Sequence, residues 1–143
     1  MRFMMLMYPS EDAEKGVLPD AKLFEAMMKY NEELSRAGVL LSLDGLQPSS
    51  KGARVTWSAE GKPTVTDGPF TEVKEIIGGY WVIQVKSREE AIEWAKRVPS
   101  HDARKIELRQ VFEMTDFPAD VQKAADSPEV RATIERIEKH ARS

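Results

Sequence analysis

Four stretches of the chain have the apolar and polar pattern of β-strands. Residues 2–8 form a short apolar run that Pro9 ends, which favours a buried strand over a helix. Alternating apolar and polar side chains, typical of strands with one buried face, follow in residues 39–44, 79–86 and 106–112. In the first of these alternating stretches, the pattern places Val39, Leu41 and Leu43 together on one face.

Two further stretches have the period of amphipathic helices. The apolar stripe that predicts the first helix recurs at Leu23, Met27, Tyr30 and Leu34. Asp20 precedes this stripe as a candidate N-cap, and Gly38 follows it at the position where helices commonly end. Ser87 and Glu90 form a capping box, so the second helix is predicted to begin there and to end before Pro99.

Between the second and third strands lies a predicted hairpin, in which residues 53–57 and 63–66 flank Glu60-Gly61. The predicted fold class is therefore α+β, with the ferredoxin-like βαββαβ pattern and an inserted hairpin. Two helices would cover one face of an antiparallel sheet, while the other face keeps apolar side chains among its polar groups. Because a small domain usually covers such a face with a second copy of itself, we expect a homodimer through the open sheet face.

The last part of the chain differs from the rest. From Pro118 onward it is helical in pattern and rich in charge, and Ser127-Pro128 is a second helix start signal. Its narrow apolar stripe consists of Val130, Ile134 and Ile137. A helix with such a stripe is stable only when the stripe packs against another apolar surface. We therefore expect a domain over residues 1–115 and a helical extension over residues 116–143, which packs on the partner subunit or across the domain's own helices.

Composition narrows the possible functions. The chain has 143 residues and no cysteine, which excludes disulfides, iron–sulfur clusters, thiolate zinc sites and cysteine nucleophiles. Its imidazoles are His101 and His140, and we expect neither a metal site nor a bound cofactor. The formal net charge of −3 argues against a nucleic-acid partner. No apolar run approaches the ~20 residues that span a bilayer, and no leader segment is recognisable, so we expect a cytoplasmic protein without a membrane partner.

The most distinctive segment is Asp67-Gly68-Pro69-Phe70, which Gly78-Gly79-Tyr80 follows closely. An Asp side chain can accept backbone N–H bonds, Gly takes unusual dihedral angles and Pro fixes the exit, so the segment predicts a tight turn. Phe70 is a lone aromatic residue in a polar loop, and we expect it to anchor that loop in the core. The glycine pair predicts a close approach of the backbone to a neighbouring group before the third strand begins.

These two motifs resemble the signature of DGPF-domain proteins, the YCII-related family. The resemblance covers about residues 1–113 and is supported by Met4-Met5-Leu6-Met7-Tyr8, Ala37-Gly38-Val39-Leu40, Gly45-Leu46-Gln47-Pro48 and Ile106-Glu107-Leu108-Arg109. It implies a dimeric α/β barrel, in which two ferredoxin-like sheets face each other and the helices lie outside. Most of the family has no assigned reaction. Its classical branch carries a His–Asp pair proposed for acid–base chemistry, and Met27 stands here at the position of that histidine.

Polar side chains near the predicted inner face point to a ligand cleft. The candidate cleft residues are Tyr8, Asp44, Asp67, Gly68, Pro69, Phe70, Tyr80, His101 and Arg109. His101 is a candidate general base with Asp102 beside it, or else a solvated loop residue after a helix end. Asp44 is the second candidate base, or else part of a turn with the glycine that follows. Arg109 would hold an anion, or else pair structurally with Glu107.

The leading hypothesis is binding of a small anionic or carbonyl-bearing molecule in this cleft. If the site is catalytic, its composition favours cofactor-free proton transfer of the isomerase or lyase type, with His101 or Asp44 as the base. The alternative is a non-catalytic regulatory or interaction module, in which the Asp67-Gly68-Pro69-Phe70 motif is purely structural. A cleft that holds the polar side chains favours the enzyme, whereas a solidly packed interior favours the module.

Overall fold

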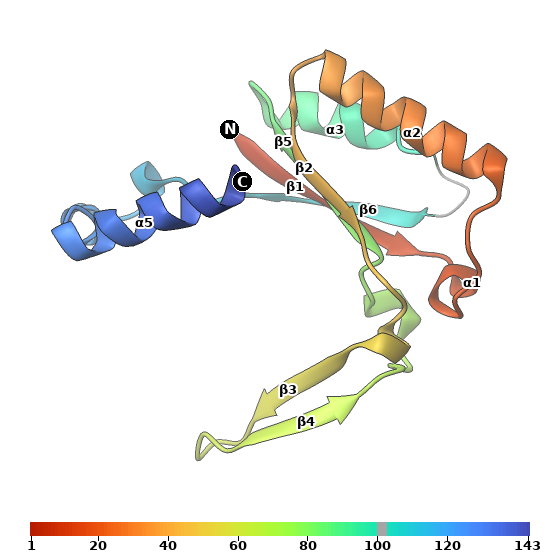
Figure 1. The fold of residues 1–143 in the computed structure, drawn as a ribbon, viewed down its shortest axis with the longest axis horizontal. Helices are drawn as coiled ribbons and strands as arrows, with labels where there is room; N and C mark the ends of the chain where they lie inside the picture. The colour runs from red at the N-terminus through yellow and green to blue at the C-terminus, as the bar shows by residue number, and fades with distance from the viewer. Residues whose placement is uncertain (100–102) are drawn as a thin grey trace. The chain divides into compact units, whose positions relative to one another are not determined.

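The computed structural model describes residues 1–99 and 103–143, and divides the chain into two compact units, Met1–Val111 and Phe112–Ser143. In chain order (Figure 1), the larger unit contains β1 (Arg2–Pro9), α1 (Glu11–Glu14), α2 (Ala21–Arg36), β2 (Leu40–Gly45), η1 (Ser49–Lys51), β3 (Ala53–Trp57), β4 (Pro63–Asp67), η2 (Val73–Glu75), β5 (Gly79–Gln84), α3 (Arg88–Lys96) and β6 (Ala103–Gln110). The smaller unit contains η3 (Met114–Asp116), α4 (Ala119–Ala125) and α5 (Pro128–Ala141). His101 and Asp102 lie outside the described residues.

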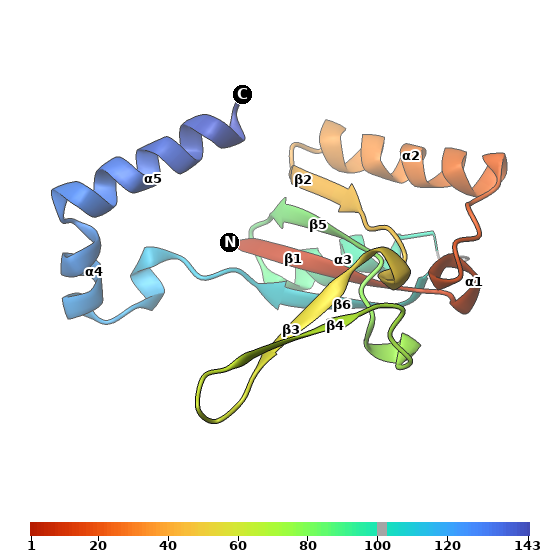
Figure 2. The same cartoon turned by 60° about the horizontal axis from the view of Figure 1, so that its bottom comes forward.

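The larger unit is built on a four-stranded sheet with the strand order β2-β5-β1-β6. Every neighbouring pair in this sheet is antiparallel. The order can be followed from top to bottom in Figure 2. With the hairpin strands β3 and β4 set aside, it is the ferredoxin-like order, which confirms the predicted α+β fold class.

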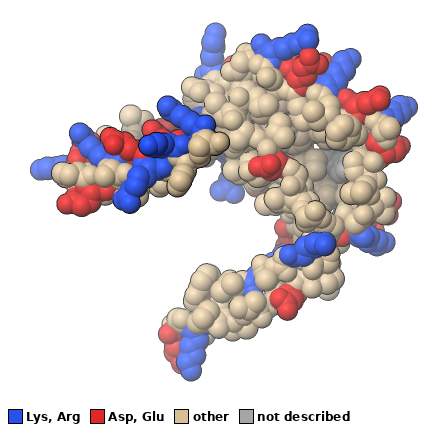
Figure 3. Space-filling model, viewed as in Figure 1, with Lys and Arg blue, Asp and Glu red and all other residues tan. Residues whose placement is uncertain are grey.

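Local sequence signals set the bounds of α2. The Asp20 carboxylate accepts a hydrogen bond of 2.8 Å from the Leu23 N–H, which satisfies one of the free N–H groups of the first turn. Gly38 follows the C-cap with a φ of 72°, a left-handed conformation that glycine adopts without a steric penalty. Charged side chains gather along the outer surface of this helix (Figure 3). The predicted first helix is thereby confirmed.

The core lies between one face of the sheet and helices α2 and α3. Its members are all buried, and they are Phe3, Met5, Tyr30, Leu34, Val39, Trp81, Ile83, Val85, Ala91 and Val98. The Tyr30 and Trp81 rings meet edge to face, with their centroids 5.7 Å apart. The polar atom of each ring has a partner, because the Tyr30 hydroxyl donates to the Trp94 carbonyl oxygen and the Trp81 indole N–H donates to Asn31.

The strict alternation predicted for the second strand is wrong. The pairing of β2 with β5 shifts between Leu40 and Ser42, so an irregularity of the bulge type interrupts the alternation at Leu41. Leu40 and Leu43 consequently both pack against the core, whereas the Leu41 side chain is 49% exposed. The residues after the bulge keep their predicted faces, which leaves Asp44 on the side of the sheet opposite the core.

Strands β3 and β4 form a separate two-stranded sheet, as predicted, and Figure 1 shows its ribbon apart from the four-stranded sheet. Val55 pairs with Val65 and Trp57 with Pro63, so these apolar side chains share one face. Every residue of both strands is exposed. Gly61, with a φ of 80°, lies in the turn between them.

In the smaller unit, α5 begins at the predicted start signal. The Ser127 hydroxyl accepts a hydrogen bond of 3.4 Å from the Val130 N–H in the first turn of this helix. The apolar stripe of that helix is solvent-accessible, with exposures of 38% for Val130, 40% for Ile134 and 63% for Ile137. In the described part of the chain, no helix combines the length and apolar character needed to cross a membrane.

Candidate functional site

The open face of the sheet, on the side opposite the core, carries four of the candidate site residues. Asp44 pairs with Tyr80, which in turn pairs with Leu6 of the central strand β1. On the other side of β1, Met4 pairs with Arg109 and Tyr8 with Lys105. Directly paired residues share a face, so Tyr8, Asp44, Tyr80 and Arg109 lie on one surface around a partly exposed apolar strip of Met4, Leu6 and Val82.

Asp44 and Tyr80 form the best-defined polar pair on this face. The Tyr80 hydroxyl donates a hydrogen bond of 3.0 Å to the Asp44 carboxylate. This hydrogen bond, and secondarily the negative charge of Asp44, raise the pKa of Tyr80, because both favour the protonated phenol. Tyr80 is therefore a neutral donor that holds the carboxylate in place, and the Asp44 carboxylate is the hydrogen-bond acceptor of the pair.

The opposite edge of the open face is cationic. Arg109 lies 3.6 Å from Glu107 in an ion pair, yet 72% of the Arg109 side chain remains exposed. An exposed pair at this distance contributes little to stability and leaves the guanidinium accessible to an anion. The Lys105 ammonium lies 4.2 Å from the centroid of the Tyr8 ring, within the range of a cation–π contact.

The Asp67-Gly68-Pro69-Phe70 segment closes the base of the hairpin rather than lining the open face. Asp67 pairs with Ala53 at the end of β4, and the Gly68 N–H donates to the Gly52 carbonyl oxygen at 3.0 Å. A Cβ atom at Gly68 would lie 1.7 Å from the Ser49 carbonyl oxygen, so only glycine fits there. The described residues contain no hydrogen bond or ion pair between this segment and the four open-face candidates.

The expectation that Phe70 anchors its loop in the core is wrong. Its ring lies under the Arg54 guanidinium, 3.8 Å from the ring centroid, and Phe70 does not belong to the core cluster. The reason is that the segment packs on η1 and the hairpin base instead of on the sheet. The Phe70 backbone N–H accordingly donates a hydrogen bond of 3.0 Å to the Ser49 hydroxyl.

Sequence reasoning missed the buried polar contact between Ser49 and Glu14. Ser49 is 8% exposed, its backbone N–H donates to the Glu14 carboxylate at 3.0 Å, and its hydroxyl donates to the same carboxylate. This contact joins α1 to η1 across 35 residues of sequence. Ser10, which caps α1 by accepting from the Ala13 N–H, is the one sequence signal that could have revealed the short helix carrying Glu14.

A cavity of about 480 Å³ lies beside this contact, and sequence reasoning did not find it either. Residues 13–19 form one of its walls and residues 45–51 another, while Met7, Pro9 and Gly78 complete the lining. The volume falls within the range of ordinary small-molecule pockets, about 300–1,000 Å³. Among the described residues, no three His, Asp or Glu side chains are grouped as a metal site would need.

Comparison with known proteins assigns the chain to a family. The YCII-related domain matches residues 1–115, about four fifths of the chain. The protein belongs to the YCII-related family. The resemblance to the YCII-related family is thereby confirmed.

Similarity to individual proteins is found both among protein sequences and among solved structures. Uncharacterized protein R00369 of Rhizobium meliloti (strain 1021) is 34% identical over 87 residues, which span 61% of this chain and 64% of that protein. Among solved structures, 5-chloro-2-hydroxyhydroquinone dehydrochlorinase (TftG) from Burkholderia phenoliruptrix AC1100, in complex with 2,5-dihydroxybenzoquinone, matches with a TM-score of 0.47 and 12% identity. That match covers 82% of this chain and all of the other chain.

Proposed function

We propose that this YCII-related protein binds a small anionic or carbonyl-bearing molecule on the open sheet face. The observation that carries the proposal is the hydrogen bond of 3.0 Å between Tyr80 and Asp44, at the edge of an apolar strip. A carboxylate held by a neutral phenol, with an accessible guanidinium on the same face, is a suitable arrangement for proton transfer to and from a bound anion.

We propose further that a second copy of the chain completes the cleft. The open face presents Met4, Leu6 and Val82 as one partly exposed strip, while helices α2 and α3 cover only the opposite face. Burial of this strip against the same strip of a partner would remove apolar surface from water and enclose the polar groups at its edges. Such a homodimer would be the dimeric α/β barrel expected from the sequence.

The chemistry that we propose for this cleft needs no cofactor. The Asp44 carboxylate takes a proton from a carbon next to the carbonyl group of the ligand, and the electrons of the broken C–H bond move to the carbonyl oxygen. In a ligand with a β,γ carbon–carbon double bond, the proton then returns to the γ-carbon, which moves the double bond next to the carbonyl group and gives an isomerisation. Arg109, on the opposite edge strand, holds an anionic group at the far end of the ligand. His101, the other candidate base, lies outside the described residues, so Asp44 carries the proposal.

Hydrogen–deuterium exchange at carbon tests the catalytic proposal. A set of β-keto acids in D₂O should lose their acidic C–H signals in proton NMR faster with the protein than without it. Asp44→Asn should abolish this acceleration, and Tyr80→Phe should lower it by about tenfold, because the carboxylate loses the donor that orients it. Asp120→Asn, which removes an exposed carboxylate from α4, is the matched control and should have no effect.

Sedimentation velocity at micromolar concentration tests the cleft itself. A species of about twice the 16.2 kDa chain mass is expected, and Leu6→Glu should convert it to the monomer by placing a charge in the apolar strip. A purely monomeric protein without C–H exchange would favour the alternative, a non-catalytic interaction module. A dimer without exchange would retain the architecture and refute the proton-transfer chemistry.

A further inference from the structure

We propose that the cavity between residues 13–19 and 45–51 is a second binding site, which takes a small monocarboxylate with a flat apolar body. It goes beyond the proposed function, because its lining includes neither Asp44, Tyr80 nor Arg109. The cavity volume of about 480 Å³ is large enough for a molecule of one or two fused rings.

The charged residues that line this cavity favour an anion. They are Glu14, Lys15 and Lys51, with one lysine on each of the two walls. Among the described residues, neither lysine ammonium has an ion-pair or hydrogen-bond partner. The Glu14 carboxylate, in contrast, already accepts hydrogen bonds from the backbone N–H and the hydroxyl of Ser49. The two ammonium groups and the one carboxylate give the cavity a net positive charge, and the ammonium groups are free to bind an anion.

The rest of the lining favours an apolar ligand body over a bare ion. Met7, Val17, Leu18 and Pro48 contribute aliphatic surface, and Gln47 and Ser50 add polar groups that carry no charge. Small-molecule sites usually combine such apolar surface with a few convergent polar groups that fix the orientation of the ligand. Inorganic phosphate would meet the lysines but leave this aliphatic surface uncovered, whereas an aromatic carboxylate would use both.

The two walls are held in place before any ligand binds. Glu14 belongs to one wall, and the bonds of its carboxylate to Ser49 fix η1, which belongs to the other. The loop after β4 also holds Ser49, because the Phe70 N–H donates a hydrogen bond to the Ser49 hydroxyl. A ligand therefore meets walls that are already linked, which lowers the entropy lost on binding.

Amide chemical-shift titration of the full chain with 2-naphthoate tests the proposal. Shifts are expected in residues 13–19 and 45–51, with saturation below about 1 mM. The neutral 2-naphthamide and inorganic phosphate should each bind at least about tenfold more weakly. The amide lacks the negative charge that the lysines bind, and phosphate lacks the apolar body that covers the aliphatic surface. The variant Lys15→Gln/Lys51→Gln should weaken naphthoate binding by a similar factor.

The matched control is Lys29→Gln/Lys62→Gln, which removes the same charge from exposed positions on α2 and in the hairpin turn. It should bind naphthoate as the unaltered protein does, and so should Asp44→Asn, which separates this site from the open face. Equal affinity for naphthoate and naphthamide, shifts confined to the open face, or no shifts at millimolar naphthoate would each overturn the proposal. The amide spectrum also reports whether each variant is folded.

Discussion

Tyr30 is the residue at which the sheet and both long helices of the larger unit meet. Its ring contacts Trp81 of β5, and its hydroxyl donates a hydrogen bond of 2.8 Å to the Trp94 carbonyl oxygen of α3. Burial raises the pKa of Tyr30 well above its ordinary value, an effect that Arg97 partly offsets and Glu33 reinforces. The folded protein therefore keeps this phenol protonated at pH values where the unfolded chain has begun to ionise.

The linked prediction concerns stability at alkaline pH. A tyrosine in the unfolded chain titrates near pH 10, so the contribution of Tyr30 is complete below about pH 10 and is lost as the pH rises further. Tyr30→Phe should cost about 0.5–1.5 kcal/mol at pH 7, because the Trp94 carbonyl loses the phenol donor and keeps only the Arg97 N–H. It should also make the free energy of unfolding fall less steeply above pH 10. Urea unfolding between pH 7 and 11.5 measures both effects. If the free energy of unfolding falls equally steeply with pH in the unaltered protein and in Tyr30→Phe, this role of Tyr30 is contradicted.

Individual residues were predictable where one strand or helix decides their environment. Trp81, Ile83 and Val85 alternate in the sequence and are buried, as the pattern indicates. Leu41 was not predictable in this way, because its exposure depends on the irregular pairing of β2 with β5. The contact of Ser49 with Glu14 depends on chain closure across 35 residues, for which no local pattern exists.

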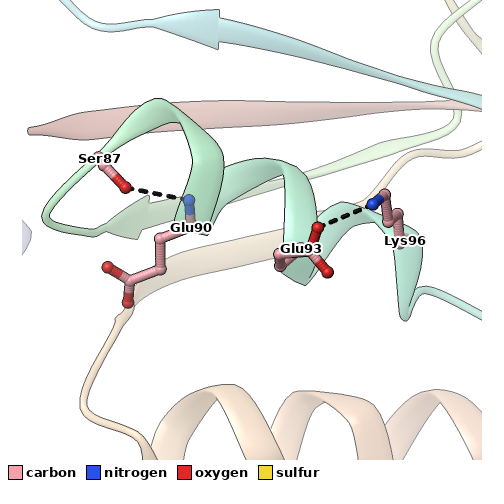
Figure 4. Close-up of polar contacts among 4 residues, drawn as sticks. All are labelled: Ser87, Glu90, Glu93 and Lys96. Carbon is pink, nitrogen blue, oxygen red and sulfur yellow. Dashed lines mark hydrogen bonds and ion pairs between the residues drawn. The ribbon is translucent and has the colours of Figure 1, made fainter.

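At the scale of elements, α3 shows how two visible contacts differ in value. The Ser87 hydroxyl accepts from the Glu90 N–H at 3.1 Å, and one turn later Lys96 pairs with Glu93 at 2.7 Å (Figure 4). The cap satisfies a backbone N–H that has no partner within the helix. The ion pair joins two side chains that are 64% and 68% exposed, where water and salt weaken the attraction.

Ser87→Ala should therefore lower the free energy of unfolding by about 1 kcal/mol. Lys96→Gln, on the same helix, should change it by less than about 0.5 kcal/mol. Chemical denaturation of both variants under one set of conditions measures the difference. A larger loss for Lys96→Gln than for Ser87→Ala would reverse this ranking of the two contacts.

The long elements could be predicted because caps and periodicity agree along each of them. Asp20, Ser87 and Ser127 all cap helices at the predicted positions. Helix α1 was missed because four residues are too few to show a helical period. The site was predicted less well than the fold. Strand parity brought the open-face candidates together, whereas Asp67 to Phe70 pack on η1, which no strand or helix pattern indicates.

At the scale of the whole molecule, the two units of the chain differ in their share of the hydrophobic core and of the family match. Every residue of the core cluster belongs to Met1–Val111, and the YCII-related match ends at residue 115. In Phe112–Ser143, the aromatic rings of Phe112 and Phe117 lie 5.1 Å apart, while the α5 stripe remains accessible. We propose that residues 116–143 are a helical extension of a domain formed by residues 1–115.

Removal of residues 116–143 should accordingly leave the core of the larger unit folded. Trp57, Trp81 and Trp94 all lie in that unit, so tryptophan fluorescence reports its thermal unfolding directly. The midpoint should move by no more than about 4 °C, whereas Leu34→Ala should cost about 2–5 kcal/mol and lower it far more. A shortened chain that fails to unfold cooperatively would show that the extension belongs to the core.

Backbone and side-chain hydrogen bonds hold the base of the hairpin β3–β4, next to η1. Gly52 and Gly68 are joined by a backbone hydrogen bond, and Ser49 and Phe70 by a second bond just outside it. Because its base is held in this way and its strands form a separate sheet, we expect that the hairpin can change in length without a change in the four-stranded sheet. Its turn at Glu60-Gly61 is therefore a natural place to graft an epitope or a fluorescent label. The protein engineer gains an attachment point that leaves the sheet and the helices untouched.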